Sequence, residues 1–403
     1  MFSSFPDWSL GGLHRGAGRR GGLVVLVGAL FHASPAMAEV EPRLTVDASV
    51  FLSSNPFLIP GSDLDTAIGE ASARPAVRIT SDRGSSLELS GVLTKRIYSR
   101  KRYKDFLIGN ARAEGSYRHS ERLSVLASAE FDRGILADQL TSGVDAAAGG
   151  QGLREDITAR FGLEWQPNRH LQVDPDVTYV NTNYMGSATT FLRDTRIITP
   201  RLTLWRRTSA YTRLGGRVQV EFNSPDHEAR FKTVSGFVTI DQRLSEHWEL
   251  TAEAGAERIG AHNLIIPGLP PIREKARTRF AGRVDLCHEG QRLTLCANAS
   301  LASEPSGFGG SERRLAGSLS ARHRVSERVT LVATGEYQHA RLQGADLSSL
   351  DALRAEGRVE WNAARNFRIA GSVEYRRQDL LTGEKVKAGF VGLRLSYDWR
   401  RKP

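Results

Sequence analysis

Charged side chains at short, regular intervals are the residues of this chain best suited to act on a solute. They include six arginines and three earlier glutamates, at Arg277, Arg279, Arg283, Arg292, Arg314, Arg322, Glu249, Glu253 and Glu257. Side chains two residues apart point to the same face of an extended strand. Such a wall around a water-filled space would attract anionic solutes or a charged glycan. The alternative is that each arginine pairs with a neighbouring carboxylate and only makes the wall rigid.

The remaining polar residues do not predict a catalytic or cofactor site. "SPDHE" (224–228) combines serine, histidine and acids, but such a run is typical of a polar loop. The sequence contains no zinc-ligand spacing, P-loop or dinucleotide fingerprint. We therefore expect no enzyme activity, no cofactor and no metal. The net charge of +10 does not indicate a nucleic-acid partner, because the arginines are spread through strands instead of forming a basic run or a recognition helix.

The elements that position these charges are long strands with one apolar face. In "LSVLASAEF" (123–131), Leu123, Val125 and Phe131 share one face. Period-two alternation of this kind indicates half-apolar β-strands. Eighteen such segments begin near residues 43, 74, 86, 104, 121, 154, 169, 191, 209, 230, 246, 275, 291, 311, 327, 351, 365 and 385.

The connections between these segments alternate in length, which distinguishes two all-β architectures. Short turns alternate with connections that are mostly longer, of which 53–73, 135–153 and 261–274 are the longest. An even strand count with short turns at one end and long loops at the other is typical of a transmembrane antiparallel β-barrel. A soluble β-sandwich would alternate similarly but usually with shorter strands. We therefore expect a barrel of about 18 strands, with short periplasmic turns, longer extracellular loops and apolar faces toward lipid.

Aromatic residues agree with this arrangement. Trp165, Trp205, Trp248 and Trp361 fall beside short turns, and Trp399 ends the last strand at the same rim, whereas Tyr98, Tyr184, Tyr337 and Tyr375 fall toward the long connections. Interfacial aromatic girdles occur at both rims of membrane barrels. We expect these residues to form two such girdles.

The N-terminus predicts export. Arg15, Arg19 and Arg20 precede an apolar run that ends before Ala36-Met37-Ala38, a small-x-small cleavage pattern. We expect residues 1–38 to be a signal peptide and residues 39–403 to be the barrel, located in the outer membrane of a Gram-negative bacterium.

The two cysteines of an exported chain could form a disulfide. A hairpin turning at Glu289-Gly290 would place Cys287 opposite Arg292 and Cys296 opposite Arg283. The two cysteines would then lie roughly 13 Å apart along the ladder, although a disulfide needs Cα atoms within about 7 Å. This register favours free thiols, whereas a bulge would permit the bond.

Two strings resemble a known family. "DASVFLSSNPF" near the start and the terminal "GLRLSYDW" are similar to proteobacterial porin-2 type outer-membrane barrels, several of which accompany exopolysaccharide synthesis and export. The second string resembles an outer-membrane assembly signal, formed by Gly392, Leu395, Tyr397 and Trp399. The chain departs from that signal by continuing through Arg400 to Pro403.

The resemblance implies a passive export conduit for an exopolysaccharide. Its expected partners are outer-membrane lipid, the barrel assembly machinery and periplasmic polysaccharide-export components, with a polysaccharide or a small solute in the lumen. The alternatives are a general diffusion porin for small, anion-leaning solutes, a plugged barrel that serves as a surface anchor and, behind these, a barrel-type enzyme.

The connection at 135–153 bears on the width of the pore. It is long and almost uncharged, and a loop of about twenty residues without structure of its own is usually functional or disordered. Folded inward it would narrow the lumen, and folded outward it would be surface.

Overall fold

The chain forms one large antiparallel sheet and one small hairpin. The computed structural model describes residues 39–61, 65–81, 84–140, 145, 150–186, 192–225, 230–264, 272–308, 310–342, 349–380 and 383–400. Within these residues, eighteen strands form the large sheet and β12 and β13 form the hairpin. The first ten strands are β1 (Glu39–Ser53), β2 (Thr66–Thr80), β3 (Ser86–Tyr98), β4 (Phe106–Ser120), β5 (Leu123–Ile135), β6 (Leu153–Asn168), β7 (Leu171–Met185), β8 (Thr195–Arg207), β9 (Thr212–Pro225) and β10 (Phe231–Arg243). The others are β11 (Trp248–Ile259), β12 (His262–Leu264), β13 (Ile272–Glu274), β14 (Arg277–Glu289), β15 (Leu293–Pro305), β16 (Ser311–Arg324), β17 (Val329–Leu342), β18 (Leu350–Ala364), β19 (Phe367–Asp379) and β20 (Lys385–Arg400).

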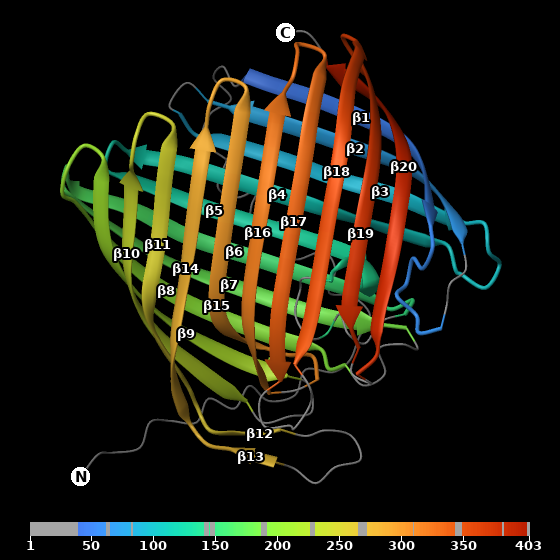
Figure 1. The fold of residues 1–403 in the computed structure, drawn as a ribbon. Helices are drawn as coiled ribbons and strands as arrows, with labels where there is room; N and C mark the ends of the chain where they lie inside the picture. Colours follow the sequence, from blue (N-terminus) through green and yellow to red (C-terminus); the bar gives the residue numbers. More distant parts are fainter. Residues whose placement is uncertain are drawn as a thin grey trace, which may run out of the picture. The chain divides into compact units, whose positions relative to one another are not determined.

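The large sheet is a closed barrel. Val46 of β1 lies opposite Ala73 of β2 on one side and Tyr397 of β20 on the other, so the first and last strands pair. Figure 1 shows the barrel wall that these strands build. Closure leaves no edge strand with unpaired N–H and C=O groups, which a sheet in lipid requires. The expected closed antiparallel barrel of eighteen strands is confirmed.

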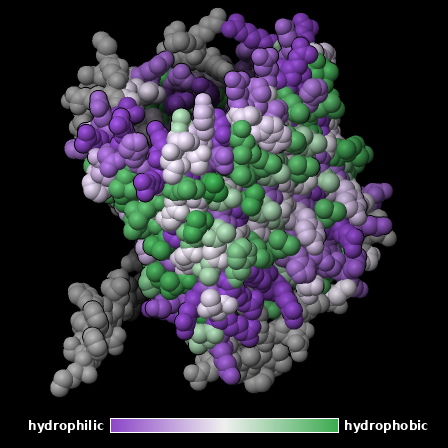
Figure 2. Space-filling model, turned by 60° about the vertical axis from the view of Figure 1, so that its left-hand side comes forward, coloured by the Kyte–Doolittle hydropathy of each residue, from purple (hydrophilic) through white to green (hydrophobic). Residues whose placement is uncertain are grey.

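The barrel wall is apolar outside and polar inside. In β20 the alternate residues Val391, Leu393, Leu395, Tyr397 and Trp399 are 40% to 60% exposed, whereas Ser396 is 6% exposed. Figure 2 shows apolar surface across the middle of the visible face and polar surface toward its ends. A closed barrel with an apolar belt satisfies its backbone in lipid, and bacterial barrels of this design lie in the outer membrane. The protein is an outer-membrane β-barrel.

Most strand starts agree with the alternation, but two features differ. The second strand begins at Thr66 instead of near 74, because its lipid-side residues Gly69, Ala71 and Ala73 are too small to produce a clear alternation. The β12–β13 hairpin within the β11–β14 connection was not predicted. Among the described residues, no helix is long and apolar enough to cross a membrane. The expected signal peptide, residues 1–38, lies outside the described residues.

The cysteine expectation was wrong, because the predicted turn was two residues too early. The hairpin turn is closed by Gly290 N–H donating to Leu293 C=O, with Glu289 opposite Thr294. Cys287 therefore lies directly opposite Cys296, with a Cα–Cα distance of 4.1 Å, and the two form a disulfide.

The aromatic residues follow the predicted rims only in part. Trp165, Trp361 and Trp399 are 45% to 49% exposed at the short-turn end of the barrel, as a lipid-facing girdle requires. Trp248 is also at that end and packs against His288, with ring centroids 4.9 Å apart. Trp205 differs, because the Arg213 guanidinium, which pairs with Asp241, covers its ring at 5.2 Å. Its strand exposes Leu202 and Leu204, so Trp205 has the opposite, inward parity.

At the other rim the expected girdle is half present. Tyr337 and Tyr375 are 43% and 42% exposed. Tyr98 instead packs against Phe57, and Tyr184 bonds to Asp145, both inside the barrel mouth. A step of one residue along a strand reverses the face, which explains why placement at a rim did not predict orientation.

Candidate functional site

The connection between β5 and β6 folds into the barrel mouth. Its described residues are 136–140, 145 and 150–152, beginning with the short 3-10 helix η2 (Leu136–Asp138). Leu136 and Leu140 are 0% and 1% exposed. Leu140 belongs to an apolar cluster with Ile68, Ala352 and Phe390, which project inward from β2, β18 and β20. Of the two expected conformations, the inward one is observed for the described residues.

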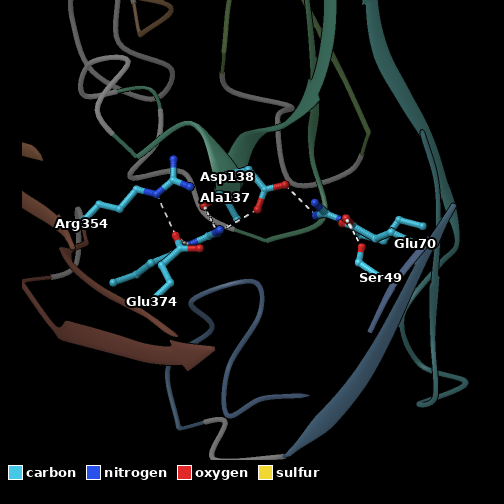
Figure 3. A network of polar contacts seen from close by, with 8 residues as sticks. Ser49, Glu70, Ala137, Asp138, Arg354 and Glu374 are labelled. Carbon is cyan, nitrogen blue, oxygen red and sulfur yellow. Dashed lines mark hydrogen bonds and ion pairs between the residues drawn. The ribbon is translucent and has the colours of Figure 1, made fainter. Parts of the chain in front are cut away.

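Asp138 attaches this inward segment to two parts of the wall. Its carboxylate accepts a hydrogen bond from Arg96 of β3 at 2.6 Å and another from Arg376 of β19 at 2.7 Å. Each arginine also pairs with a glutamate nearby in the sheet. Arg96 pairs with Glu70 of the adjacent strand β2, and Arg376 pairs with Glu374 of the same strand β19, both at 2.6 Å. Figure 3 shows Asp138 between these two groups. One carboxylate therefore joins β3 to β19 across the β20–β1 closure.

These two arginines stabilise the ionised form of the Asp138 carboxyl group. Burial alone would raise the pKa of its carboxyl, but the Arg96 and Arg376 guanidinium groups hold the pKa well below its usual range. Arg376 also donates to the Ala137 carbonyl oxygen at 3.4 Å. The segment is thus fixed by charge-assisted hydrogen bonds, which are stronger than neutral ones.

A second carboxylate, Asp145, attaches the same connection elsewhere. It accepts hydrogen bonds from the Tyr184 hydroxyl at the end of β7, from Ser306 Oγ at 3.0 Å and from Gly307 N–H at 2.8 Å. Asp145 is 6% exposed, and residues 306–307 belong to the β15–β16 connection. Asp138 and Asp145 together tie one connection to β3, β7, β19 and the β15–β16 connection, so it extends across the mouth.

The β1–β2 connection also packs into the mouth through Phe57. Phe57 is 1% exposed and lies 5.1 Å from Tyr98 and 4.8 Å from Tyr103, measured between ring centroids. Its carbonyl oxygen accepts a hydrogen bond from Gly150 N–H at 3.3 Å. The two inward connections therefore support each other and narrow the mouth between them.

Below the mouth, the lumen wall over β18, β19 and β20 carries a run of alternating charges. The pairs are Arg376–Glu374, Arg354–Glu374, Arg354–Glu356, Arg358–Glu356, Arg358–Glu360, Arg368–Glu360 and Arg368–Asp398, with N–O distances from 2.6 to 3.9 Å. The run begins at Asp138 and descends to the short-turn end. A solute that passes the mouth would meet this wall of paired charges.

The predicted arginines are in the barrel, and three of the six pair with acids, so they do not form a bare positive surface. Arg283 pairs with Asp285 at 2.6 Å, Arg314 with Glu304 at 2.7 Å and Arg322 with Glu360 at 3.5 Å. Of the glutamates, Glu253 pairs with Arg217 at 2.8 Å and Glu257 with Arg313 at 2.6 Å. The other predicted residues do not gather at one place. Arg277 is exposed at the start of β14, and Arg292 is in the β14–β15 turn. In the pairing of β11 with β14, Arg279 lies opposite Glu257 and Glu249 lies opposite Cys287.

The residues at the constriction were missed in the sequence. "LRAEGRVE" (353–360) places Arg354, Glu356, Arg358 and Glu360 at every second position, which was a visible signal for one lumen-facing ladder. Asp138 and Asp145 carried no comparable signal, because they are two isolated acids in one long connection, without a charged residue at every second position. Their partners are far away in the sequence; Arg376 is 238 residues from Asp138.

The expected assembly string occupies β20. Leu395, Tyr397 and Trp399 lie on the lipid side and are 40%, 50% and 45% exposed. Gly392 lies opposite Phe51 of β1, and the Phe51 ring occupies the space that a Cβ atom at Gly392 would need. No group of three or more His, Cys, Asp or Glu within the described ranges could hold a metal ion.

Comparisons with known proteins return only distant structural likenesses. No family model matches the sequence, and no curated protein matches it. Pseudomonas aeruginosa OccK9 (OpdG) is similar at a TM-score of 0.47 and 11% identity, over 90% of this chain and 99% of that chain. Acinetobacter baumannii OccAB4 gives 0.44 and 10%, over 90% and 98%, and the outer-membrane protein opdK of Pseudomonas aeruginosa gives 0.45 and 9%, over 90% and 99%. A likeness at this level transfers neither substrate nor partner to this chain, and the expected membership of an exopolysaccharide-associated family finds no support in it.

Proposed function

We propose that the protein is a passive outer-membrane channel for small hydrophilic solutes, narrowed at its long-connection end. The observation that carries the proposal is the inward connection anchored by Asp138 and Asp145 above a lumen lined with charges. An eighteen-stranded barrel is too wide for wall side chains alone to fill, so water occupies the rest. The inward connections then set the width through which a solute passes.

The same observation favours small solutes over a polymer. Asp138 and Asp145 join the connection to opposite parts of the mouth, and a glycan chain would have to pass beside it. Export of an exopolysaccharide, expected from the family resemblance, has no contact in the described residues that favours it. We propose that the channel is a diffusion porin without a catalytic site.

The charge of the preferred solute follows from the wall. Along β18 to β20, arginines and acids alternate and pair, so that wall favours neither sign strongly. The predicted group at Arg277, Arg279, Arg283, Arg292, Arg314 and Arg322 lies beside an equal number of acids, Glu249, Glu253, Glu257, Asp285, Glu304 and Glu360. We propose that this side of the lumen contacts the solute without a strong preference for either charge sign.

Export and assembly belong to the same proposal. Residues 1–38 act as a signal peptide, and the lipid-side residues Leu395, Tyr397 and Trp399 with Gly392 present the last strand to the assembly machinery. The lipid-facing tryptophans Trp165, Trp248 and Trp361 then hold the short-turn rim at the membrane interface.

Liposome swelling tests the channel. Purified protein in liposomes should admit pentoses and hexoses quickly and exclude oligosaccharides of increasing length. Shortening the inward connection by deletion of 138–150 should move the cut-off to larger sugars. Liposomes that stay impermeable to every sugar, with folded protein in the membrane, would contradict the proposal and favour a plugged surface anchor.

A further inference from the structure

The short-turn rim of the barrel carries an excess of positive charge. Seven short connections, each taken from the second-last residue of one strand to the first residue of the next, are described without a gap: 119–123, 167–171, 206–212, 242–248, 288–293, 323–329 and 363–367. They contain nine arginines, Arg122, Arg169, Arg206, Arg207, Arg243, Arg292, Arg324, Arg328 and Arg365. They contain four acids, Glu121, Glu246, Glu289 and Glu327. Each of the seven connections has at least one of the arginines.

These rim arginines differ from many arginines of the lumen. Inside the barrel, Arg283, Arg314 and Arg358 each pair with an acid. In the part of the chain that the structure describes, none of the nine rim arginines has an ion pair or a side-chain hydrogen bond, and all nine are exposed. The protein itself therefore does not neutralise the positive charge of this rim.

Two adjacent connections of the rim contain arginines but no acid. They are the β6–β7 turn, 167–171, and the β8–β9 turn, 206–212, which hold Arg169, Arg206 and Arg207. The Arg207 N–H group donates to the His170 carbonyl oxygen at 2.8 Å, so the end of β8 lies beside the β6–β7 turn. Three exposed arginines therefore occupy one sector of the rim, and no acid lies in either turn.

Arg206 has the parity of the lipid side of the wall. In β8 the alternate residues Leu202 and Leu204 are exposed to lipid, and Arg206 is the next residue of that series. Its partners in the two neighbouring strands, Leu171 of β7 and Leu214 of β9, are also exposed. Arg206 is the second-last residue of β8, so it lies at the membrane interface, where a long side chain extends its charge into the head groups.

The chemistry of this sector selects an anionic head group. The nearest acids along β6 and β7, Glu164 and Asp174, have the inward parity and do not balance Arg206 on the lipid side. A guanidinium group binds phosphate oxygens through two parallel N–H groups. A head group with a net negative charge is attracted by Arg169 and Arg207 as well, whereas the ammonium group of a zwitterionic head group is repelled by the same cations.

We propose that Arg169, Arg206 and Arg207 form a binding site for an anionic glycerophospholipid of the leaflet beside the short turns. Arg206 binds the phosphate group, and Arg169 and Arg207 add to the attraction of its negative charge. The acyl chains lie along the exposed leucines of β7, β8 and β9. The site is on the outer surface of the barrel and is separate from the path of a solute through the lumen.

Lipid titration followed by native mass spectrometry tests the site. Delipidated protein in detergent should bind phosphatidylglycerol several-fold more tightly than phosphatidylethanolamine with the same acyl chains. Arg169→Gln with Arg206→Gln should weaken phosphatidylglycerol binding by about tenfold. Arg122→Gln with Arg243→Gln is the matched control, because it removes the same charge from two turns that each contain an acid, and it should change the affinity by less than about twofold. Equal losses in the two double variants, or equal affinities of the wild type for the two lipids, would overturn the proposal.

Photolabelling in liposomes tests where the lipid binds. Phosphatidylglycerol with a diazirine near the start of its acyl chain should form adducts on Leu171, Leu204 and Leu214, mapped by mass spectrometry. Leu293 is the reference, because it is exposed at the same rim beside a connection with one arginine and one acid. The ratio of site adducts to Leu293 adducts should be several-fold higher than for phosphatidylethanolamine with the same label. Equal ratios for the two lipids would contradict a selective site.

Competition and permeation measurements separate the lipid site from other roles of these arginines. Raising the salt concentration should weaken phosphatidylglycerol binding, because exposed charges are screened. Soluble muropeptides, which carry carboxylates, should not displace the lipid, and displacement would assign the arginines to the cell wall instead. Arg169→Gln with Arg206→Gln should admit hexoses into liposomes like the wild type. A loss of permeation in this variant with unchanged lipid binding would place the arginines in the solute path and overturn the site.

Discussion

At the scale of single residues, Asp138 explains why the β5–β6 connection stays inside the barrel. Its carboxylate lies between Arg96 and Arg376, whose side chains are 17% and 7% exposed. Without Asp138, the buried guanidinium groups of Arg96 and Arg376 would each lose one carboxylate partner, and an uncompensated buried charge destabilises the fold. The inward position is therefore maintained by electrostatics as well as by the apolar contacts of Leu140.

Replacing Asp138 should destabilise the fold more than replacing an exposed acid. Asp138→Ala is expected to lower the free energy of unfolding by about 3 kcal/mol, the lower end for a broken buried pair, because Asp138 keeps 23% of its side chain exposed. The control is Asp105→Ala, whose pair with Lys95 is 3.8 Å long and about half exposed; its effect should stay below about 1 kcal/mol. Urea unfolding followed by tryptophan fluorescence measures both. Equal effects would contradict the role of Asp138.

The lowered pKa of Asp138 predicts how the constriction responds to acid. Because the folded-state pKa lies below the usual value of about 3.9, the stabilisation is complete above that value and is lost only as the pH falls through the lower folded-state pKa. Conductance in planar bilayers should therefore stay level from pH 7 to about 4 and change only at more acidic pH. A transition near pH 5 to 6 would assign control of the mouth to another group.

Residue types predicted a polar face of each strand, but not which charges meet. Arg283, Arg314 and Glu253 are members of ion pairs in the barrel wall, and their contact with a solute stays a prediction. Which charge meets which depends on the register between strands, which no single strand encodes. The inward orientation of Trp205 escaped prediction for a different reason: its place at a rim does not specify which face of its own strand it occupies.

At the scale of elements, the closure of the barrel depends on a fit between β1 and β20. Phe51 covers Gly392 across the strand pair, and a side chain there would meet the ring. Aromatic cover of a glycine is a known means of fixing register in a barrel. The glycine of the expected assembly string therefore also has a role in closure.

A double substitution tests this fit. Gly392→Ala should reduce the yield of folded barrel, because the new Cβ atom meets the Phe51 ring. Phe51→Ala in addition should recover most of the yield by removing the ring. Folded and unfolded forms are separated by electrophoresis with and without boiling. Additive losses in the double variant would show that the two residues act separately.

The last strand also offers a test of assembly. Tyr397→Ala with Trp399→Ala should lower the amount of inserted barrel in cells, because the variant presents fewer lipid-side aromatic groups to the assembly machinery. Refolding of the same variant in detergent should be affected less. Wild-type levels in the membrane would contradict this role.

Element boundaries were largely predictable, but turns were less so. Half-apolar alternation placed most strands because lipid and water select opposite faces throughout a barrel. The β14–β15 hairpin shows the limit of such predictions. The predicted turn would separate Cys287 from Cys296, whereas the observed turn, two residues later, places them opposite each other. Glu289, expected in the turn, instead ends β14, and Gly290 begins the actual turn.

At the scale of the whole molecule, eighteen repeats of one pattern made the barrel predictable, whereas the constriction was not. The barrel follows from alternation that is local in sequence. The constriction joins Asp138 to Arg376 and Asp145 to Gly307, which are distant in the chain and become neighbours only after closure. We propose that this inward connection limits flow through an otherwise open lumen.

Single-channel conductance in planar bilayers tests that claim most directly. Wild-type protein should give discrete conductance steps, and Asp138→Ala with Asp145→Ala should give clearly larger or more variable steps, because the connection loses both anchors. Asp105→Ala, an exposed acid at the same end, is the matched control and should conduct like wild type. Absence of steps in folded wild-type protein, or identical steps in the double variant, would contradict the account.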